Sequence, residues 1–388
     1  MQEDFHYYAT YCAAYLAGFK PEECLDICYS AQLVDWCSAT FLSQLKAPAA
    51  AATTQLQMEL METRTDTIGL QNITRIWASF HFLPYDLYAK KAGCSKGYLK
   101  KYRLICNTNS DLLVDTVNLA KGKSLQAAGI AMHVLADTWA HRYFAGTPSM
   151  VINNTNHYFY ELIPDGDTFT ERQIKFNHNP GSKDDCKEGI YTNTINQFSE
   201  NSIMSLGHGR AGHLPDYSFM RYKYLPAWGE YKEILKDNPS DYYNAFCQMV
   251  YALKFLKGTN ASFEKNMYDT EAVDGLKDEI MAILEKRQMD SCEDWKALGE
   301  KLTGVSIEKF DMNKYKDEYM GSEGEEKDKS FLGRFILAAL AQKSMVTERI
   351  FKSGNRLAGI SVDYSKKGFK GIRAFRKLVE RRERRDES

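Results

Sequence analysis

His133-Val-Leu-Ala-Asp137-Thr-Trp-Ala-His141 is the stretch that decides how this chain folds. Three side chains that bind metal ions recur every four residues, inside an apolar segment bounded by Ser124 and Gly146. If residues 123–143 form a helix, steps of about 100° per residue place all three on one face. The stretch therefore predicts a buried helix that carries a row of metal ligands.

The length of the row bears on the number of ions. At a rise of ~1.5 Å per residue, His133 and His141 lie about 12 Å apart, with Asp137 midway. Imidazole and carboxylate ligands reach a metal at roughly 2.0 to 2.2 Å, so one ion cannot serve both histidines easily. Burying a carboxylate between two imidazoles without a cation costs several kcal/mol. The spacing therefore favours two ions, with Asp137 near or between both.

Composition bounds the class of protein. The chain has 388 residues, is 44% hydrophobic and 13% aromatic, and can bury a sizeable core. The net charge of −1 argues against a surface that coats nucleic acid. Residues 366–385 carry +8, which leaves −9 for the rest of the chain. We therefore expect a metal-binding helical domain over residues 1–353 and a basic C-terminal tail over residues 354–388.

The tail has the pattern of a basic amphipathic helix. Its apolar residues recur at a spacing of three to four: Phe369, Ile372, Phe375 and Leu378/Val379. Either this stripe packs back on the body, or the surrounding arginines bind an anionic partner such as a lipid or a nucleic acid.

The start of the chain lacks the pattern of a signal peptide. No window approaches the roughly 18 uninterrupted apolar residues of a membrane-spanning helix. The nine cysteines have no paired CxxC spacing, so they read as buried, reduced thiols. We expect a cytoplasmic protein without a transmembrane segment.

Periodicity predicts helices over most of the chain: residues 21–39, 111–120, 123–143, 194–206, 242–256, 270–286, 293–302 and 329–351. Residues 153–189 are polar and aromatic, which is typical of a long ordered loop or a small β-excursion near a site. Short extended structure is possible near residues 73–83, and residues 323–329 read as a charged linker. The fold class predicted is all-α (mainly α), a multi-helix bundle with a long polar loop insertion.

Further ligand candidates lie outside the central helix. His208 and His213 share the glycine-punctuated turn GHGRAGHLPD, and His6 and His81 each have aromatic neighbours. Asp35 lies on the apolar face of a predicted helix, where an acid requires a cation. The full set of candidate metal ligands is His6, Asp35, His81, His133, Asp137, His141, His208 and His213.

This set contains imidazoles and carboxylates but no thiolate, which suits Zn, with Fe or Mn as alternatives, and leaves positions for water. An open site with several metals indicates hydrolysis. Asp35 or Asp137 would accept the proton from the attacking water, and Arg142 or Arg210 would bind a phosphate oxygen of the substrate.

The order of these residues resembles the zinc-dependent phospholipase C and single-strand nuclease superfamily, an all-α fold with three zinc ions. The segments DFHYYATYCAAYLAGF, YSAQLVDWCS, HVLADTWAHRYFAG and GHGRAGHLPD look more closely like those of an uncharacterised bacterial family of unknown function, over about the first 350 residues. The superfamily resemblance implies three groups of ligands: Asp35, His81, His133 and Asp137; Asp137 with His6; and His141 with His208 or His213.

The sequence also departs from that superfamily. The superfamily uses the amino group of a mature N-terminal Trp as a ligand, whereas this chain has Met1, and Asp4 is the candidate replacement. The third-site histidine and the glutamate that follows it have no clear equivalent, so two ions are expected before three.

The predicted function is a metal-dependent hydrolase, a phosphoesterase with a di- or trinuclear His/Asp site, acting on a small-molecule or lipid-like phosphoester. One alternative is a phosphohydrolase of the His-Asp type, against which stands the absence of an adjacent His-Asp pair. The other is a non-catalytic, metal-stabilised helical binding or sensor protein.

Overall fold

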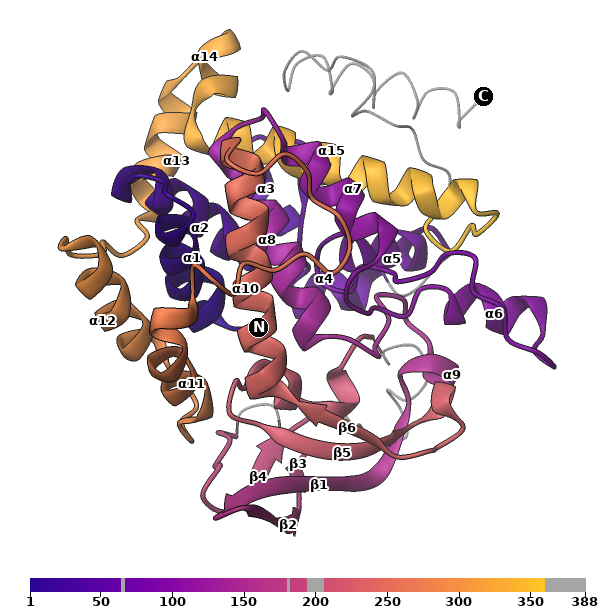
Figure 1. Cartoon of the computed structure of the whole chain (residues 1–388). Coiled ribbons are helices and arrows are strands. Elements are labelled where there is room, and N and C mark those ends of the chain that lie inside the picture. The colour runs from indigo at the N-terminus through magenta and orange to yellow at the C-terminus, as the bar shows by residue number, and fades with distance from the viewer. Residues whose placement is uncertain (64–66, 180–181, 194–205, 360–388) are drawn as a thin grey trace, which may run out of the picture.

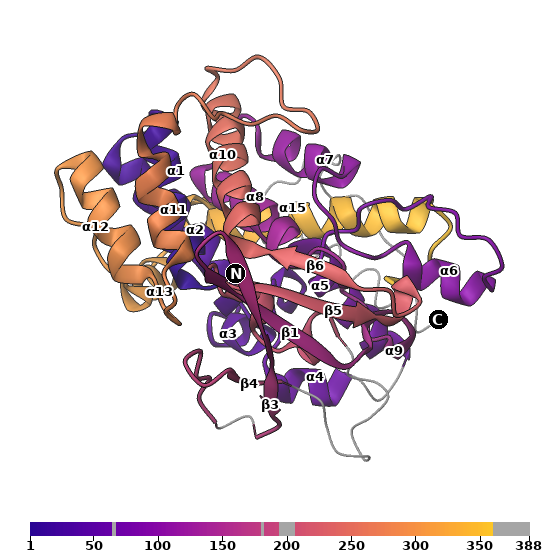
Figure 2. The same ribbon diagram turned by 60° about the horizontal axis from the view of Figure 1, so that its bottom comes forward.

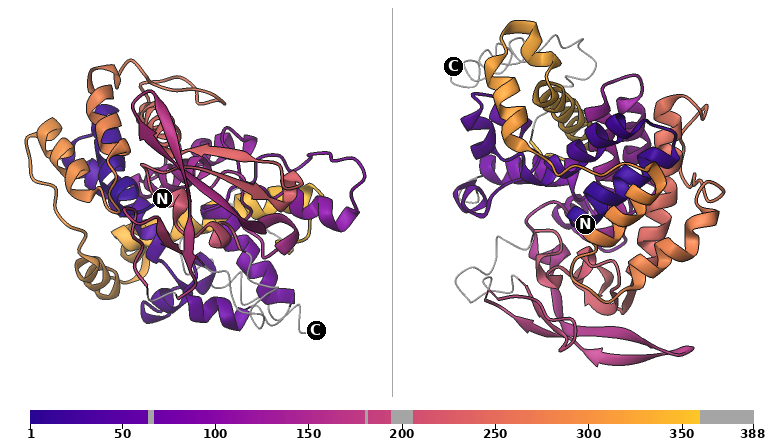
Figure 3. Two further views of the ribbon diagram at one scale, coloured as in Figure 1. Left: turned by 90° about the horizontal axis from the view of Figure 1, so that it is seen from below. Right: turned by 90° about the vertical axis from the view of Figure 1, so that its left-hand side faces the viewer.

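A body of helices packs against a curled β-sheet at one end of the molecule (Figure 1). The computed structural model describes residues 1–63, 67–179, 182–193 and 206–359. Figure 3 shows the sheet as a separate layer beside the helical body, and the N-terminus lies where the two meet. The junction between helices and sheet is therefore the place to look for a site.

The first half of the described chain is almost entirely helical. Its helices are η1 (a π-helix, Asp4–Ala9), α1 (Thr10–Leu16), α2 (Pro21–Trp36), α3 (Ala39–Gln44), η2 (Ala49–Ala51), α4 (Gln57–Thr63), α5 (Thr67–Phe80), α6 (Lys96–Tyr102), α7 (Asp111–Ala120), α8 (Leu125–Ala140) and α9 (Met150–Asn153). Helices return after the sheet as α10 (Asn238–Lys257), α11 (Lys277–Glu285), α12 (Cys292–Thr303), α13 (Met312–Gly321), α14 (Gly324–Lys329) and α15 (Phe331–Lys352).

Helix α8 is the predicted ligand helix, and it lies at the centre of the body (Figures 1 and 2). Ser124 caps its start, because the hydroxyl accepts a hydrogen bond from the backbone N–H of Ala127. Helices α2, α7, α10 and α15 pack around it and bury nearly all of its residues. Its central place explains why its sequence is apolar on every side.

Helices α2 and α8 approach each other very closely at Gly129. A Cβ atom at this position would lie 2.3 Å from the carbonyl oxygen of Ile27 and 2.6 Å from the Cβ of Ser30. Only glycine therefore permits this contact between the two helices.

The predicted all-α fold class is wrong, because the protein is mixed α/β. The strands β2 (Thr168–Gln173), β1 (Thr155–Asp165), β5 (Arg221–Pro226) and β6 (Ile234–Asp237) form a four-stranded antiparallel sheet in that order, and β3 (Lys175–Asn177) pairs in parallel with β4 (Ile190–Thr192). Strand β5 alternates strictly between buried and half-buried residues. No element is predicted from the sequence over residues 221–226, because this period of two extends over only six residues.

The sheet builds a second hydrophobic core, in which aromatic rings from β1 and β5 stack on the chain that follows α8. The ring of Tyr224 lies 5.5 Å from that of Phe159 and 5.7 Å from that of Phe144, nearly parallel to both. The sheet is thereby fixed against the C-terminal end of α8.

Two other local expectations were also wrong. Residues 73–83, expected to include extended structure, lie mostly in α5, and the predicted linker 323–329 contains α14. The predicted helix 194–206 lies almost wholly outside the described residues.

The tail predicted over residues 354–388 is described only to residue 359. There Asn355 donates a hydrogen bond to the carbonyl of Lys100, and the carbonyl of Ala358 accepts one from Arg75. The predicted apolar stripe of the tail lies outside the described residues. Among the helices of the described segments, none is long and apolar enough to cross a membrane.

Candidate metal centre

The fold brings seven of the eight predicted ligands into three overlapping groups, in each of which the ligand atoms lie within 4.8 Å of one another. The groups are His6, His133 and Asp137; Asp35, His81 and His133; and His141, His208 and Asp216. The first two share His133, and the third continues from them along α8. Apart from Asp35 and His208, which are partly buried, every member is buried.

On the helical side of the centre, two imidazoles converge on one oxygen of Asp137. His133 Nε2 and His81 Nδ1 each lie 3.2 Å from Asp137 Oδ2. The same two nitrogens lie 3.9 and 3.8 Å from Asp35 Oδ1. We call these four residues the helix-side group, because α2 carries Asp35, α8 carries His133 and Asp137, and His81 directly follows α5.

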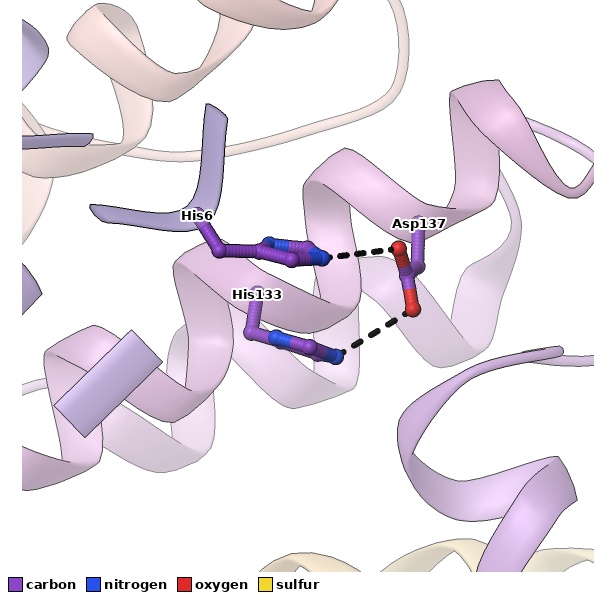
Figure 4. Close-up of side chains that lie close together, drawn as sticks. All are labelled: His6, His133 and Asp137. Atoms are coloured by element: carbon purple, nitrogen blue, oxygen red, sulfur yellow. Dashed lines mark ion pairs between the residues drawn. The ribbon is translucent and has the colours of Figure 1, made fainter. Parts of the chain in front are cut away.

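His6 approaches the other oxygen of Asp137. Its Nε2 lies 3.2 Å from Oδ1, and its ring stacks on that of His133 with centroids 3.8 Å apart (Figure 4). The other ring nitrogen of His6, Nδ1, has no hydrogen-bond partner among the described residues, although the side chain is fully buried. His6 lies in η1, which is a π-helix. Such turns are rare in proteins, and those that occur are often found at functional sites.

The opposite side of the centre is built on Asp216, which the sequence reasoning missed. Asp216 Oδ1 lies 3.0 Å from His141 Nε2, and its Oδ2 lies 3.6 Å from His208 Nε2. We call His141, His208 and Asp216 the turn-side group, since the 3₁₀ turns η3 (Gly209–Ala211) and η4 (Leu214–Asp216) hold the latter two. The signal was present in His213-Leu-Pro-Asp216, but an Asp after Pro reads as an ordinary turn residue.

The predicted ligand His213 is outside the three groups. Its Nδ1 lies 3.0 Å from Asp216 Oδ2, but its side chain is 57% exposed. This bond to Asp216 raises the pKa of His213. His213 therefore holds the carboxylate of Asp216 from the solvent side.

The amino group of Met1 lies between the two sides of the centre. Its nitrogen is 3.0 Å from Asp137 Oδ1, 3.2 Å from Asp216 Oδ1 and 3.3 Å from His141 Nε2. Burial disfavours its charge, but the carboxylates outweigh burial and raise its pKa to about 11. Asp4, the candidate replacement for an amino ligand, instead accepts a hydrogen bond from the backbone of Phe5 and belongs to none of the groups.

Four histidines of the centre are oriented in the same way, by a ring nitrogen that donates to a backbone carbonyl. The pairs are His133 Nδ1 with Ala31 at 2.9 Å, His81 Nε2 with Thr53 at 3.1 Å, His141 Nδ1 with His81 at 2.8 Å and His208 Nδ1 with Gly212 at 2.6 Å. A carbonyl can only accept, so that nitrogen carries the hydrogen and the other nitrogen of a neutral ring has a free lone pair. Histidines that bind metals are oriented in this way.

The free lone pairs point at carboxylates. Two of them face Asp137 Oδ2, and two face Asp216. Burial lowers the pKa of His133 and His208 to about 4, so both rings are neutral at pH 7. Burial opposes ionisation of Asp137 and Asp216, but the surrounding histidines and the amino group keep both pKa values well below the ordinary value. Lone pairs facing anions repel each other, and a bound cation reverses that repulsion.

The two predicted phosphate-binding arginines have different surroundings. Arg142 pairs with Asp241 at 3.0 Å. The guanidinium of Arg210 is partly buried, which lowers its pKa, and it makes no ion pair or hydrogen bond to any residue that the structure describes.

A comparison with known families matches one family over residues 1–350. The chain belongs to DUF6765, a family of unknown function. The DUF6765 match contains every residue of the three ligand groups and confirms the expected membership of a family of unknown function. No curated protein and no solved structure matches the chain.

Proposed function

We propose that this DUF6765 protein is a metal-dependent phosphoesterase with a di- or trinuclear His/Asp centre. One observation carries the proposal: four imidazoles, each fixed by a backbone carbonyl, direct free lone pairs at two buried carboxylates. Among the described residues, the amino group of Met1 is the one cation paired with these carboxylates, and its single charge does not balance two buried anions.

The ligand groups assign residues to ions. The helix-side group would hold one ion, His6 and Asp137 a second beside it, and the turn-side group a third. Nitrogen and oxygen donors without thiolate suit zinc, with iron and manganese as alternatives. When bound, such ions lower the pKa of a coordinated water toward about 7 and stabilise the charge that develops on a phosphoryl group.

The two candidate catalytic carboxylates differ in their surroundings. Asp137 is 1% exposed and both its oxygens contact imidazoles, so its role is to hold ions. The side chain of Asp35 is 29% exposed, and burial of its inner part raises its pKa. Asp35 can therefore exchange protons with solvent, and we assign to it the acceptance of the proton from the attacking water.

Arg210 is the candidate contact to the substrate. Its guanidinium has no counter-ion among the described residues, and it follows His208 by two positions. A phosphate oxygen bound near His208 would supply that counter-ion through a two-pronged contact.

The test measures metal and catalysis separately. We expect the purified full chain to contain at least two equivalents of metal by plasma mass spectrometry and to hydrolyse bis(p-nitrophenyl) phosphate. Asp35→Asn should lose most of the hydrolysis and keep at least the ions assigned to the groups that do not contain Asp35. Bound metal without hydrolysis of any phosphodiester or phosphomonoester would overturn the enzyme and leave the metal-stabilised binding or sensor protein. A chain that binds no metal would overturn the centre itself.

A further inference from the structure

Figure 1 shows the lower end of α8 close to β5 and β6. Charged side chains meet there, since Lys236 of β6 donates to the carbonyl of Trp139 in the last turn of α8. Lys236 of β6 is fully buried and contacts Asp241 of α10 at 2.6 Å, and Arg142 contacts the other oxygen of Asp241 at 3.0 Å. Both oxygens of Asp241 are thus occupied, and two cations share one carboxylate.

Two cations, Arg142 and Lys236, therefore face one carboxylate, and one positive charge has no counter-ion among the residues that the structure describes. The cost of burial is visible at Lys236, where burial lowers the pKa to about 8 despite the contact with Asp241. The side chain of Arg142 is 20% exposed and that of Lys236 is fully buried, and a buried charge without a partner of opposite sign is costly.

Three buried donors in the same place have no acceptor within the described chain. They are Nε of Arg142 and the hydroxyls of Tyr222 and Tyr224. Both tyrosines are fully buried, lie two apart on β5 and so share one face, with ring centroids 5.7 Å apart. A buried hydroxyl without a partner costs on the order of 1–3 kcal/mol, so two side by side require an explanation.

The surroundings keep these hydroxyls protonated. Burial raises the pKa of both phenols, with Asp216 and Asp241 adding to the effect at Tyr222. Each phenol therefore keeps its hydrogen and can donate it. Arg142 directly follows the metal-ligand candidate His141, and Tyr222 lies within the electrostatic reach of Asp216, so these donors adjoin the turn-side group.

We propose that Arg142, Tyr222 and Tyr224 form an oxyanion-binding site that receives a phosphoryl oxygen of the substrate. The donor chemistry is that of phosphate recognition, one guanidinium N–H and two phenolic O–H groups around one excess positive charge. That the anion is the substrate rests on the proposed function, whereas anion binding itself does not require turnover.

The test uses inorganic phosphate as the probe. Calorimetric titration of the full-length, metal-containing protein should show phosphate binding, and the double variant Tyr222→Phe/Tyr224→Phe should bind about tenfold more weakly or worse. Its metal content should stay unchanged, because neither hydroxyl belongs to a ligand group. The matched control is Tyr158→Phe, which removes a hydroxyl paired with Glu233 on the exposed side of the sheet and should leave phosphate affinity unchanged.

The opposite result is equally clear. If the hydroxyls hold only water, the double variant binds phosphate as tightly as the wild type and is at least as stable, since two unsatisfied groups have been removed. That outcome, or a wild-type protein that binds no phosphate, overturns this site. Neither of these two outcomes depends on hydrolysis. If only the proposed phosphoesterase function is wrong, the protein binds phosphate but does not hydrolyse phosphoesters. Arg142→Lys provides a second variant, because it keeps the charge beside Asp241 but removes Nε.

Discussion

The helix-side and turn-side groups use the same kinds of ligand but place them by different means. On the helix side, Asp35 and His133 come from packed helices whose periods are visible in the sequence. On the turn side, His208 directly precedes the 3₁₀ turn η3 and Asp216 ends the 3₁₀ turn η4, and both turns lie between β4 and β5. The sequence allowed the helix ligands and His208 to be predicted as candidates, whereas Asp216 could be recognised only from the tertiary fold.

Asp137 belongs to the helix-side group and also lies 3.4 Å from His141 Nδ1 of the turn-side group, so its loss should have the largest effect. Asp137→Ala removes the carboxylate that contacts His6, His81 and His133, and it should abolish metal binding altogether. We expect a loss of about 3–5 kcal/mol in the free energy of unfolding, as for other broken buried ion pairs. Metal analysis and chemical denaturation measure both effects.

A matched control for that variant is Asp115→Ala, which removes a partly exposed partner of Arg349 on α7. It should cost at most about 1 kcal/mol and leave the metal content unchanged. Full metal content in Asp137→Ala would contradict the centre.

The next effect separates the two groups. Asp216→Asn removes the charge at the centre of the turn-side group but touches no residue of the helix-side group. We expect the metal content to fall by one equivalent while the remainder stays bound. His133→Ala should give the converse loss, on the helix side. If both variants lose all metal, the two groups form one cooperative site and the distinction between them fails.

Acid should weaken both groups. Burial lowers the pKa of His6, His133 and His208 to about 4, against about 6.5 in the unfolded chain. The unfolded chain therefore takes up protons first, so the stability of the metal-free protein is complete above pH 6.5 and is lost as the pH falls from 6.5 toward 4. Denaturation at pH 7.5 and pH 5 measures this loss, and His208→Gln should reduce it. Equal stability at both pH values would show that these histidines are not buried as neutral rings.

The smallest effect is expected at the solvent side of the turn-side group. His213→Ala removes an exposed side chain that contacts Asp216 but lies outside the ligand groups. Metal content should be retained, with at most a severalfold weaker affinity for the last ion, as measured by competition with a chelator. Loss of a full equivalent would instead identify His213 as a ligand.

The sequence allowed much of the helical side to be predicted, and little of the sheet. Helix α7 was expected at its observed bounds, and α8 lies within the expected range, because caps and a period near 3.6 are local signals. Strand β5 was not predicted, since a six-residue alternation of tyrosines with polar residues gains its meaning only from pairing with β1. Asp216 was missed for the same reason, because its partners His141 and Met1 are distant in sequence.

Because Gly129 has no side chain, it sets the distance between helices α2 and α8. It lies one helical turn before His133 and permits the backbone of α2, which carries Asp35, to come close to α8. Any side chain there would push α2 outward and so lengthen the contact between Asp35 and His133 without altering a single donor atom. The spacing of the two helices that carry Asp35 and His133 is thus set by a position that belongs to none of the ligand groups, and on the proposed function this spacing would limit the size of ion that the helix side accepts.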